Sequence, residues 1–283
     1  MIVVARPAGQ LANRLFQFAQ FVALAAEAEV TVADPALGHY ARHFPAFARD
    51  AACRYPAPKR PLPPRLRSAV VSAAAAGLRA GTKIPGVEVV ELSDGMTCDL
   101  DGPAFRRRVA EARVTLVGGW GFNGTQTFHR HFDELRRVFA PSRACRTAAE
   151  DALHAARRGA GLVVGVHRRR GDYAHWNEGR FLFPDAAYGR VMRSVADALG
   201  KDVSFLVCSD EPVDPDTFPG VQVTPGPGSP IVDLQALSLC DYIVGPPSTF
   251  SAWASFMGDV PRYELHDPDS PVTHESFKEV GGP

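Results

Sequence analysis

The chain has 283 residues, of which 46% are hydrophobic and 22% charged, and its formal net charge is zero. This composition excludes a disordered chain and argues against a general nucleic-acid binder. Five scattered cysteines fit neither a zinc site nor a disulfide framework, and they favour a reducing compartment. The first residues lack a signal-peptide pattern, and no window approaches the roughly 20 apolar residues of a membrane span. We therefore expect a soluble, cytoplasmic protein.

The first half of the chain alternates short apolar runs with helical stretches, which is typical of a parallel sheet covered by helices. Ile2–Ala5 is the first expected strand, and a loop with Gly9 leads from it into a helix. Asn13, Gln17 and Gln20 form a polar face of this helix, and such a face ordinarily meets solvent. The other expected strands of this half are Val30–Ala33, Val87–Leu92 and Val114–Val117.

The second half repeats the alternation after a helix expected around Ala144–Arg157. Leu162–His167 is a nearly continuous apolar run, as in a strand buried on both faces. The remaining expected strands are Val203–Cys208, Val221–Thr224 and Tyr242–Val244, and the expected helices are Asp185–Leu199, Ile231–Cys240 and Thr249–Met257. We interpret the chain as two α/β domains, residues 1–150 and 151–283.

One segment of the first half, between Asp50 and Glu88, holds basic residues and no acidic one. Its basic residues are Arg54, Lys59, Arg60, Arg65, Arg67, Arg79 and Lys83. A solvated surface segment explains this composition, and the alternative is contact between residues 54–83 and a membrane surface or an anionic acceptor.

The strongest candidate site follows the apolar run that ends at His167. Three arginines, a glycine and Asp172 come directly after it. The carboxyl ends of parallel strands line the ligand crevice of an α/β sheet. Because a guanidinium matches phosphate oxygens, Arg169 and Arg170 indicate an anionic ligand, unless the cluster only pairs with surface acids. Asp172 could orient an arginine or accept a proton.

Two further strand ends carry polar residues. Tyr242–Val244 leads through a turn into a helix whose cap is Ser248, and the Ser248 and Thr249 hydroxyls and free N–H groups could bind an anion. Asp210 follows Val203–Cys208, where it suits ribose hydroxyls or base N–H donors, although an ordinary loop explains it equally well. Phe250, Trp253 and Phe256 lie at helical spacing, which favours a place in the core over contact with a ligand.

The sequence gives weaker indications of metal binding and of dinucleotide binding. Asp-x-Asp triplets begin at Asp99, Asp214 and Asp267, but such triplets are common in loops, and we predict no metal site. Residues 119–124 fit the G-x-G-x-x-G pattern of a dinucleotide-binding loop. Trp120 inside the tight turn is awkward, and no strand that ends in an acid follows at the required distance.

Three segments resemble the signature segments of bacterial α-1,2-fucosyltransferases, glycosyltransferase family 11. They are Gly9 with Asn13–Ala19, His167–Tyr173 and Ser248–Ala254, and weaker similarity covers Ser209–Pro212 and Val117–Trp120. The His-x-Arg-Arg pattern also resembles that of α-1,6- and protein O-fucosyltransferases. The resemblance implies a GT-B arrangement, in which two Rossmann-like domains face a cleft and the C-terminal one holds GDP-β-L-fucose.

The resemblance also implies residue roles. Arg169 would neutralise the pyrophosphate in place of a metal, so no cofactor is expected, and His167 would lie toward the nucleoside. The other donor-binding residues would be Gly9, Asn13, Arg170, Asp210, Ser248, Thr249 and Phe250, with Gly9 and Asn13 closing a loop over the donor from the first domain.

The expected activity is an inverting transfer of L-fucose from GDP-fucose to a glycan hydroxyl, by analogy α-1,2. Asp172, Glu178 or water would take the acceptor proton. The alternatives are another GDP-sugar as donor, a non-catalytic nucleotide-sugar or glycan-binding protein, and an NAD(P)-dependent oxidoreductase. The expected location is the cytoplasm, with residues 54–83 as a candidate contact to the inner face of the membrane.

Overall fold

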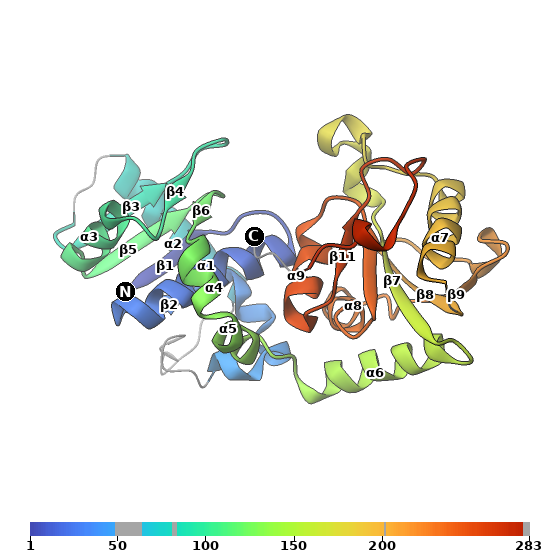
Figure 1. Ribbon diagram of the computed structural model, residues 1–283. Coiled ribbons are helices and arrows are strands. Elements are labelled where there is room, and N and C mark those ends of the chain that lie inside the picture. The colour runs from blue at the N-terminus through green and yellow to red at the C-terminus, as the bar shows by residue number, and fades with distance from the viewer. Residues whose placement is uncertain (49–63, 81–83, 201, 280–283) are drawn as a thin grey trace. The chain divides into compact units, whose positions relative to one another are not determined.

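The computed structural model describes residues 1–48, 64–80, 84–200 and 202–279, and the chain divides into two α/β units, Met1–Ser142 and Arg143–Gly282 (Figure 1). Helix α6 (Arg143–Arg157) belongs wholly to the second unit, because it packs against strands and helices of that unit. The domain boundary predicted at residue 150 falls inside this helix.

The first unit contains a parallel four-stranded sheet in the order β2-β1-β5-β3. The strands of the unit are β1 (Ile2–Arg6), β2 (Val32–Ala33), β3 (Val87–Glu91), β4 (Cys98–Asp99), β5 (Val114–Gly118) and β6 (Phe122–Asn123), of which β4 and β6 pair separately. Its helices are α1 (Leu11–Ala28), α2 (Pro64–Arg79), α3 (Pro103–Glu111), α4 (Thr125–Arg130) and α5 (Phe132–Val138).

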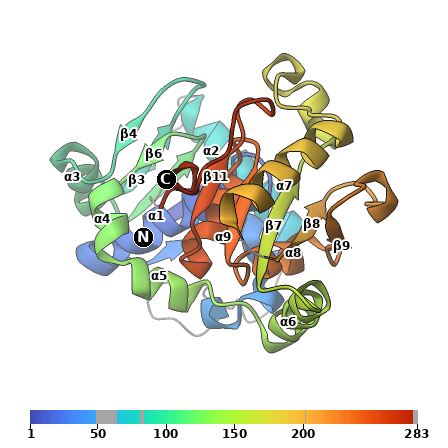
Figure 2. The same cartoon turned by 45° about the vertical axis from the view of Figure 1, so that its right-hand side comes forward.

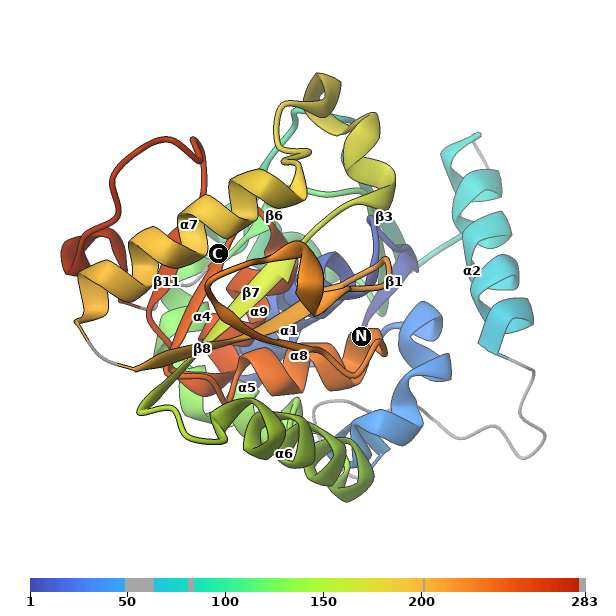
Figure 3. The same cartoon turned by 90° about the vertical axis from the view of Figure 1, so that its right-hand side faces the viewer.

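Alternating side chains on β1 give the first sheet two apolar faces. Val3 and Ala5 pack with Ala75 of α2 in one cluster of buried residues. Because side chains alternate along a strand, Ile2 and Val4 point to the opposite face, where α1 lies (Figure 3). Both are at most 2% exposed. The sheet is therefore covered by a helix on each face, as the alternation of elements predicted.

Two of the three residues on the polar face of α1 are buried, so the expectation that this face meets solvent was wrong for Gln17 and Gln20, whereas Asn13 is partly exposed. Gln17 and Gln20 are only 3% and 4% exposed. Gln17 Nε2 donates to the Gly119 carbonyl at 2.6 Å, and Gln20 Oε1 accepts from the Gly124 N–H at 2.9 Å. Both amides satisfy backbone groups of the segment that follows β5, which otherwise would be buried without partners.

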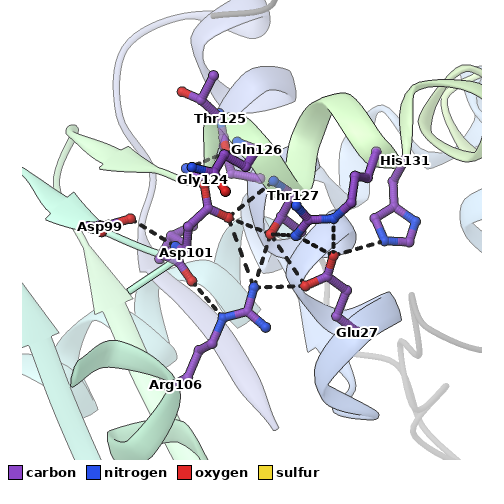
Figure 4. Close-up of polar contacts among 12 residues, drawn as sticks. Glu27, Asp99, Asp101, Arg106, Gly124, Thr125, Gln126, Thr127 and His131 are labelled. Atoms are coloured by element: carbon purple, nitrogen blue, oxygen red, sulfur yellow. Dashed lines mark hydrogen bonds and ion pairs between the residues drawn. The ribbon is translucent and has the colours of Figure 1, made fainter. Parts of the chain in front are cut away.

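A polar network joins the end of α1 to α3 and α4 (Figure 4). Glu27 accepts hydrogen bonds from Arg106 at 2.8 Å and from Arg130 at 2.7 Å. Burial raises the pKa of Glu27, but hydrogen bonds from the two guanidinium groups outweigh it and lower the pKa to about 2. Asp101 accepts from the Thr127 N–H at 3.1 Å, so it satisfies a free donor at the start of α4. These contacts hold the three helices as one body.

The second unit contains a parallel five-stranded sheet in the order β11-β10-β7-β8-β9. Its strands are β7 (Leu162–Arg168), β8 (Val203–Ser209), β9 (Gln222–Pro225), β10 (Tyr242–Gly245) and β11 (Arg262–Glu264). Its helices besides α6 are α7 (Asp185–Leu199), α8 (Pro230–Leu237) and α9 (Thr249–Gly258). Short 3-10 helices connect these elements, two of them between β7 and α7 at Gly171–Ala174 and Trp176–Gly179.

Helices cover both faces of the second sheet. Figures 2 and 3 show α7 on one side of β7 and β8, and α6 and α8 on the other. Val164 and Val166 pack with Val191 of α7, and all three are at most 2% exposed. A strand that is covered on both faces carries apolar residues at consecutive positions, which explains the continuous apolar run of β7.

The basic segment predicted as a membrane or acceptor contact lies partly outside the described residues, at 54–63 and 81–83. Within its described part, Arg65 is exposed, and Arg79 of α2 forms an ion pair with Glu91 at 3.3 Å. None of the helices in the described part of the chain combines the length and apolar character that crossing a membrane requires. Membrane contact through this segment stays a prediction.

Candidate functional site

The candidate site lies where the strand order of the second sheet reverses. From β7 the chain runs outward through β8 and β9, and it then returns to the other side of β7 with β10 and β11. Ligands of open α/β sheets bind at the carboxyl ends of the strands at such a switch point. Here the switch point lies between β7, which ends in the arginine cluster, and β10, which leads into α9.

Arg169 is a partly buried cation just after β7, with 17% of its side chain exposed. Its Nε donates to Asp172 at 2.8 Å, and its Nη1 lies 3.3 Å from Asp210 Oδ2. The guanidinium also lies over the Tyr173 ring, with Cζ 5.8 Å from the ring centroid. These contacts fix the orientation of the guanidinium, and the two carboxylates compensate its charge.

The two neighbouring arginines have different roles. Arg168 is buried and forms a bidentate pair with Asp185 at the start of α7, at 2.7 and 3.2 Å, so it ties the strand to the helix. Arg170 donates to the Phe183 carbonyl at 2.9 Å and lies 3.4 Å from Glu211. The cluster thus contains one structural arginine, and Arg169 and Arg170 remain the candidates for an anionic ligand.

Asp210, at the end of β8, lies against the arginine segment. Its Oδ1 accepts from the Arg170 N–H at 2.9 Å while its Oδ2 faces Arg169. A Cβ atom on Gly171 would lie 2.7 Å from Asp210 Oδ2, so a larger residue there would require the Asp210 carboxylate to shift. The structure therefore brings together the ends of β7 and β8, as the sequence predicted.

The turn after β10 contributes the third part of the site. Ser248 caps α9 by accepting from the Phe250 N–H at 3.1 Å, and Thr249 is the first residue of the helix. The Tyr173 hydroxyl donates to the Pro247 carbonyl at 2.6 Å, which joins this turn to the segment after β7. The start of α9, which carries the positive end of the helix dipole, therefore lies beside the arginine segment.

His167 is buried at the end of β7 and stacks on Phe250, with 4.8 Å between the ring centroids. Its Nδ1 has no hydrogen-bond partner among the described residues. Burial, and then the nearby Arg169 and Arg262, lower the pKa of His167 to about 3. At neutral pH the ring is therefore uncharged and Nδ1 is an unsatisfied polar atom, as expected of a group that serves a ligand.

We expect His167 to make stability depend on pH. The unfolded histidine binds a proton below about pH 6.5, whereas the folded one does so only near pH 3. The uncharged His167 ring therefore does not reduce the free energy of unfolding above pH 6.5, and this free energy decreases as the pH falls from 6.5 toward 3. Between pH 7 and 5 the loss is about 2 kcal/mol. Urea unfolding of wild type and His167→Phe at both pH values measures it.

A substitution of His154, exposed on α6, controls for the removal of one histidine. The interpretation is refuted if His167→Phe retains the full difference in unfolding free energy between the two pH values.

Gly9 and Asn13 meet within the first unit. Gly9 has a φ of +58°, and a Cβ atom there would lie 2.0 Å from Asn13 Nδ2. This position therefore requires glycine both for its backbone conformation and for the approach of the amide. The Gly9 carbonyl accepts from Arg14 Nε at 3.0 Å, which further fixes the loop. That Gly9 and Asn13 close a loop over the donor stays a prediction.

The two candidate bases are both exposed. Asp172 lies in the 3-10 helix after the arginines, with 49% of its side chain exposed. Glu178 lies in the next 3-10 helix, in a left-handed backbone conformation with a φ of +57°.

Three residues that surround the site were not predicted from the sequence, namely Tyr173, Arg262 and Glu264. The available signal for the edge strand β11 was the alternation of polar and aromatic residues at 262–264.

The Asp-x-Asp triplets form local turns. In each, the first carboxylate accepts from the backbone N–H of the second aspartate, at distances from 2.9 to 3.1 Å. Among the residues that the structure describes, no cluster of three histidine, cysteine or acidic side chains could hold a metal ion. Residues 119–124 include strand β6 and so do not form a turn from a strand directly into a helix.

The fold is shared with solved fucosyltransferase structures. The chain is 14% identical to a mutant of Arabidopsis thaliana FUT1 in complex with GDP (TM-score 0.62; 98% of this chain and 73% of that chain covered). It is 16% identical to the fucosyltransferase NodZ from Bradyrhizobium (TM-score 0.54; 100% and 99% covered) and 14% identical to POFUT1 in complex with GDP (TM-score 0.54; 92% and 97% covered). The predicted class, GT-B type α/β with two Rossmann-like units, is confirmed.

The family follows from the sequence itself. Residues 116–262, which begin within β5, end at the first residue of β11 and make up more than half of the chain, match the model of glycosyl transferase family 11. The chain belongs to this family, as its three signature segments predicted. A comparison with curated proteins finds no match.

Proposed function

We propose that the protein transfers L-fucose from GDP-fucose to a hydroxyl of a glycan acceptor, an α-1,2 transfer with inversion at the anomeric carbon. Membership of glycosyl transferase family 11 supports a glycosyl donor. Among proteins of this fold, FUT1 has been solved in complex with GDP, and the α-1,6-fucosyltransferase NodZ has been solved after soaking with GDP-fucose (TM-score 0.55). We assign the donor to Arg143–Gly282 and the acceptor side to Met1–Ser142.

The observation that carries the proposal is the Arg169 guanidinium beside the start of α9 at the switch point. When the bond between fucose and the diphosphate breaks, negative charge grows on the leaving diphosphate. Arg169, Arg170 and the N–H groups of Thr249 and its neighbours would stabilise that charge more in the transition state than in the bound substrate. This is the charge compensation that a divalent cation supplies elsewhere, so we propose a metal-independent reaction.

Asp172 is the base that the geometry favours. Its carboxylate accepts a hydrogen bond from Arg169 Nε, and the diphosphate of a bound donor would take its place there. With half of its side chain exposed, Asp172 can rotate away without unfolding its surroundings. Released from the cation, the carboxylate could accept the proton of the acceptor hydroxyl, which a carboxylate paired with arginine does poorly. Glu178 and water remain the other proton acceptors.

The nucleoside would lie on the side of His167 and Asp210. His167 Nδ1 offers an acceptor or a donor to ribose or guanine, and Phe250 supports its ring. Asp210 already accepts from the Arg170 N–H, and it could exchange its Arg169 contact for ribose hydroxyls or base N–H groups. A nucleotide bound in this way would give His167 Nδ1 the hydrogen-bond partner that it lacks among the described residues.

A donor screen tests the proposal. The protein is incubated in separate reactions with GDP-fucose, GDP-mannose, UDP-sugars or NAD(P)H, each with and without a glycan acceptor such as lactose and with a chelator present, while its Tm and donor turnover are measured. We expect GDP-fucose alone to raise the Tm and to be both hydrolysed and transferred, because ligand binding to the folded state stabilises it. Omitting the chelator and adding Mg²⁺ should change the rate little.

Any other outcome of the donor screen would contradict part of the proposed function. Turnover of GDP-mannose in place of GDP-fucose would reassign the donor. Binding of a GDP-sugar without any hydrolysis or transfer would indicate a nucleotide-sugar-binding protein, and a response to NAD(P)H alone would indicate an oxidoreductase. Activity that the chelator abolishes would contradict the role given to Arg169.

A further inference from the structure

The start of α7 binds two of the three residues in the arginine segment, 168–170. Asp185 pairs with the Arg168 guanidinium at 2.7 Å. Just before the helix, the Phe183 carbonyl accepts a hydrogen bond from Arg170 Nη1 at 2.9 Å. These two contacts hold the start of α7 against the end of β7. The residue between the two arginines, Arg169, is the one that the proposed function places at the diphosphate.

Tyr188 of α7 lies under the arginine segment. It follows Asp185 by three residues, so the two side chains share one face of the helix. The Tyr188 ring packs with Val166 and Tyr173 in one cluster of buried residues. Because Val166 and Tyr173 stand on either side of the arginine segment in the sequence, a ring that contacts this cluster reaches the backbone of Arg169 from its buried side.

The Tyr188 hydroxyl is buried without a hydrogen bond of normal geometry. The residue is 1% exposed, and its oxygen has no hydrogen-bond partner among the described residues. Burial raises the pKa of Tyr188, and the nearby Arg169 backbone N–H offsets only part of this effect. At neutral pH the group is therefore an uncharged hydroxyl, which can accept a hydrogen bond from that N–H but cannot take a proton from a substrate.

Such a hydroxyl is unfavourable for stability. A buried oxygen that forms no hydrogen bond destabilises the folded state, whereas a phenylalanine ring would fill nearly the same space without this cost. Places where a sequence departs from the choice that stability favours are expected at functional sites. The oxygen of Tyr188 therefore calls for a role in the site that Arg169 forms.

Donor binding would remove the side-chain contacts that orient Arg169 in this structure. Its Nε donates to Asp172 at 2.8 Å, and its Nη1 lies 3.3 Å from Asp210 Oδ2. Under the proposed function, the diphosphate replaces Asp172 and the nucleoside competes for Asp210. A hydrogen bond to the backbone of Arg169 from the buried side competes with neither ligand group, so it can persist while the guanidinium exchanges its partners.

We propose that Tyr188 is a positioning residue for Arg169: when the diphosphate is bound, the Arg169 backbone N–H donates to the Tyr188 oxygen, and this bond holds the guanidinium toward the leaving group. The inference rests on the proposed function and names a buried residue on which the same site depends. A cation stabilises the developing charge best when its position is already fixed before the transition state. Loss of the bond should therefore lower kcat more than it weakens binding of the intact donor.

Tyr188→Phe tests the proposal because it removes only the oxygen. With saturating GDP-fucose and lactose, we expect kcat to fall about tenfold, as for the loss of one hydrogen bond, while the KM for GDP-fucose stays within about threefold of wild type. The Tm should equal or exceed that of wild type, because an unsatisfied buried oxygen is removed. A hydroxyl with a purely structural role would give a lower Tm and an unchanged kcat, and that result would overturn the proposal.

A control variant and a double mutant show whether the effect passes through Arg169. Tyr242→Phe removes a hydroxyl at the amino end of β10, where it lies 3.3 Å from His274 Nε2, and should leave kcat unchanged. In an Arg169→Ala background, Tyr188→Phe should cause no further loss, because there is no guanidinium left to position. A tenfold loss in both backgrounds, or an equal loss in Tyr242→Phe, would contradict the positioning role.

Binding of GDP separates this proposal from the proposed function. GDP carries the charge of the departed diphosphate, so its Kd, measured by titration calorimetry, should rise about tenfold in Tyr188→Phe. If the Kd rises in this way but wild type turns over no GDP-fucose, the positioning role stands and the fucosyltransferase assignment falls. If wild type transfers fucose and Tyr188→Phe matches it in kcat and Kd, the assignment stands and the positioning role falls. A wild-type protein that binds no GDP would refute both.

Discussion

Fucosyl transfer is expected to fall at least about a hundredfold in Arg169→Ala, with the fold intact. Arg169 is the partly buried cation at the switch point, and its guanidinium would face the charge that grows on the leaving diphosphate. Removal of one such preorganised group costs about 3 kcal/mol of transition-state stabilisation. The measurement is kcat with saturating GDP-fucose and lactose, accompanied by the circular dichroism spectrum and the Tm of the variant.

Two further variants make this result specific. Arg169→Lys keeps a positive charge but loses the planar fork, so we expect activity between those of wild type and Arg169→Ala. Arg190→Ala removes an exposed arginine that pairs with Asp269 on the surface of the same unit, and it should leave kcat unchanged. A kcat for Arg169→Ala within a few-fold of wild type would refute the role assigned to this residue.

The second large effect is expected on stability. Asp185→Ala should lower the free energy of unfolding by about 3 kcal/mol, because it leaves the Arg168 guanidinium buried without its countercharge. Only 6% of the Arg168 side chain is exposed, and its one other described side-chain partner is the Ser209 hydroxyl at 2.9 Å. Urea denaturation at pH 7 measures this difference.

Asp197→Ala on the exposed side of α7 is the matched control, and it should change the free energy of unfolding by less than about 0.5 kcal/mol. Asp185→Asn should lie between the two, since an amide oxygen can still accept one hydrogen bond from Arg168. An Asp185→Ala loss of less than about 1 kcal/mol would show that Arg168 finds compensation elsewhere.

The second unit was predictable from sequence to a large extent. A fully buried strand needs a continuous apolar run, so β7 was evident, and the amphipathic spacing of α7 gave its bounds, Asp185–Leu199, as the structure has them. Once these strands are parallel, their carboxyl ends must share one edge. The meeting of Arg169, Asp210 and Ser248 at that edge followed from topology alone.

Other features depend on partners that are distant in the sequence. Nothing local shows that Gln17 is buried, because its partner is the Gly119 carbonyl 102 residues away. The sequence also did not show which of the three arginines is structural, because what distinguishes Arg168 from its neighbours is its ion pair with Asp185. Strand β11 was missed because its alternating pattern, the one available signal, covers only the three residues Arg262–Glu264.

The segment between Tyr173 and Leu182 is held at its two ends and not along its length. Tyr173 fastens its start to the turn before α9, and the bond from Leu182 to Gly179 closes its end. Between these anchors the chain shares side-chain contacts with the cation site but no strand pairing. Because its anchors lie at the two ends, a change of sequence inside this stretch would leave the pairing of β7 with β8 and β10 intact.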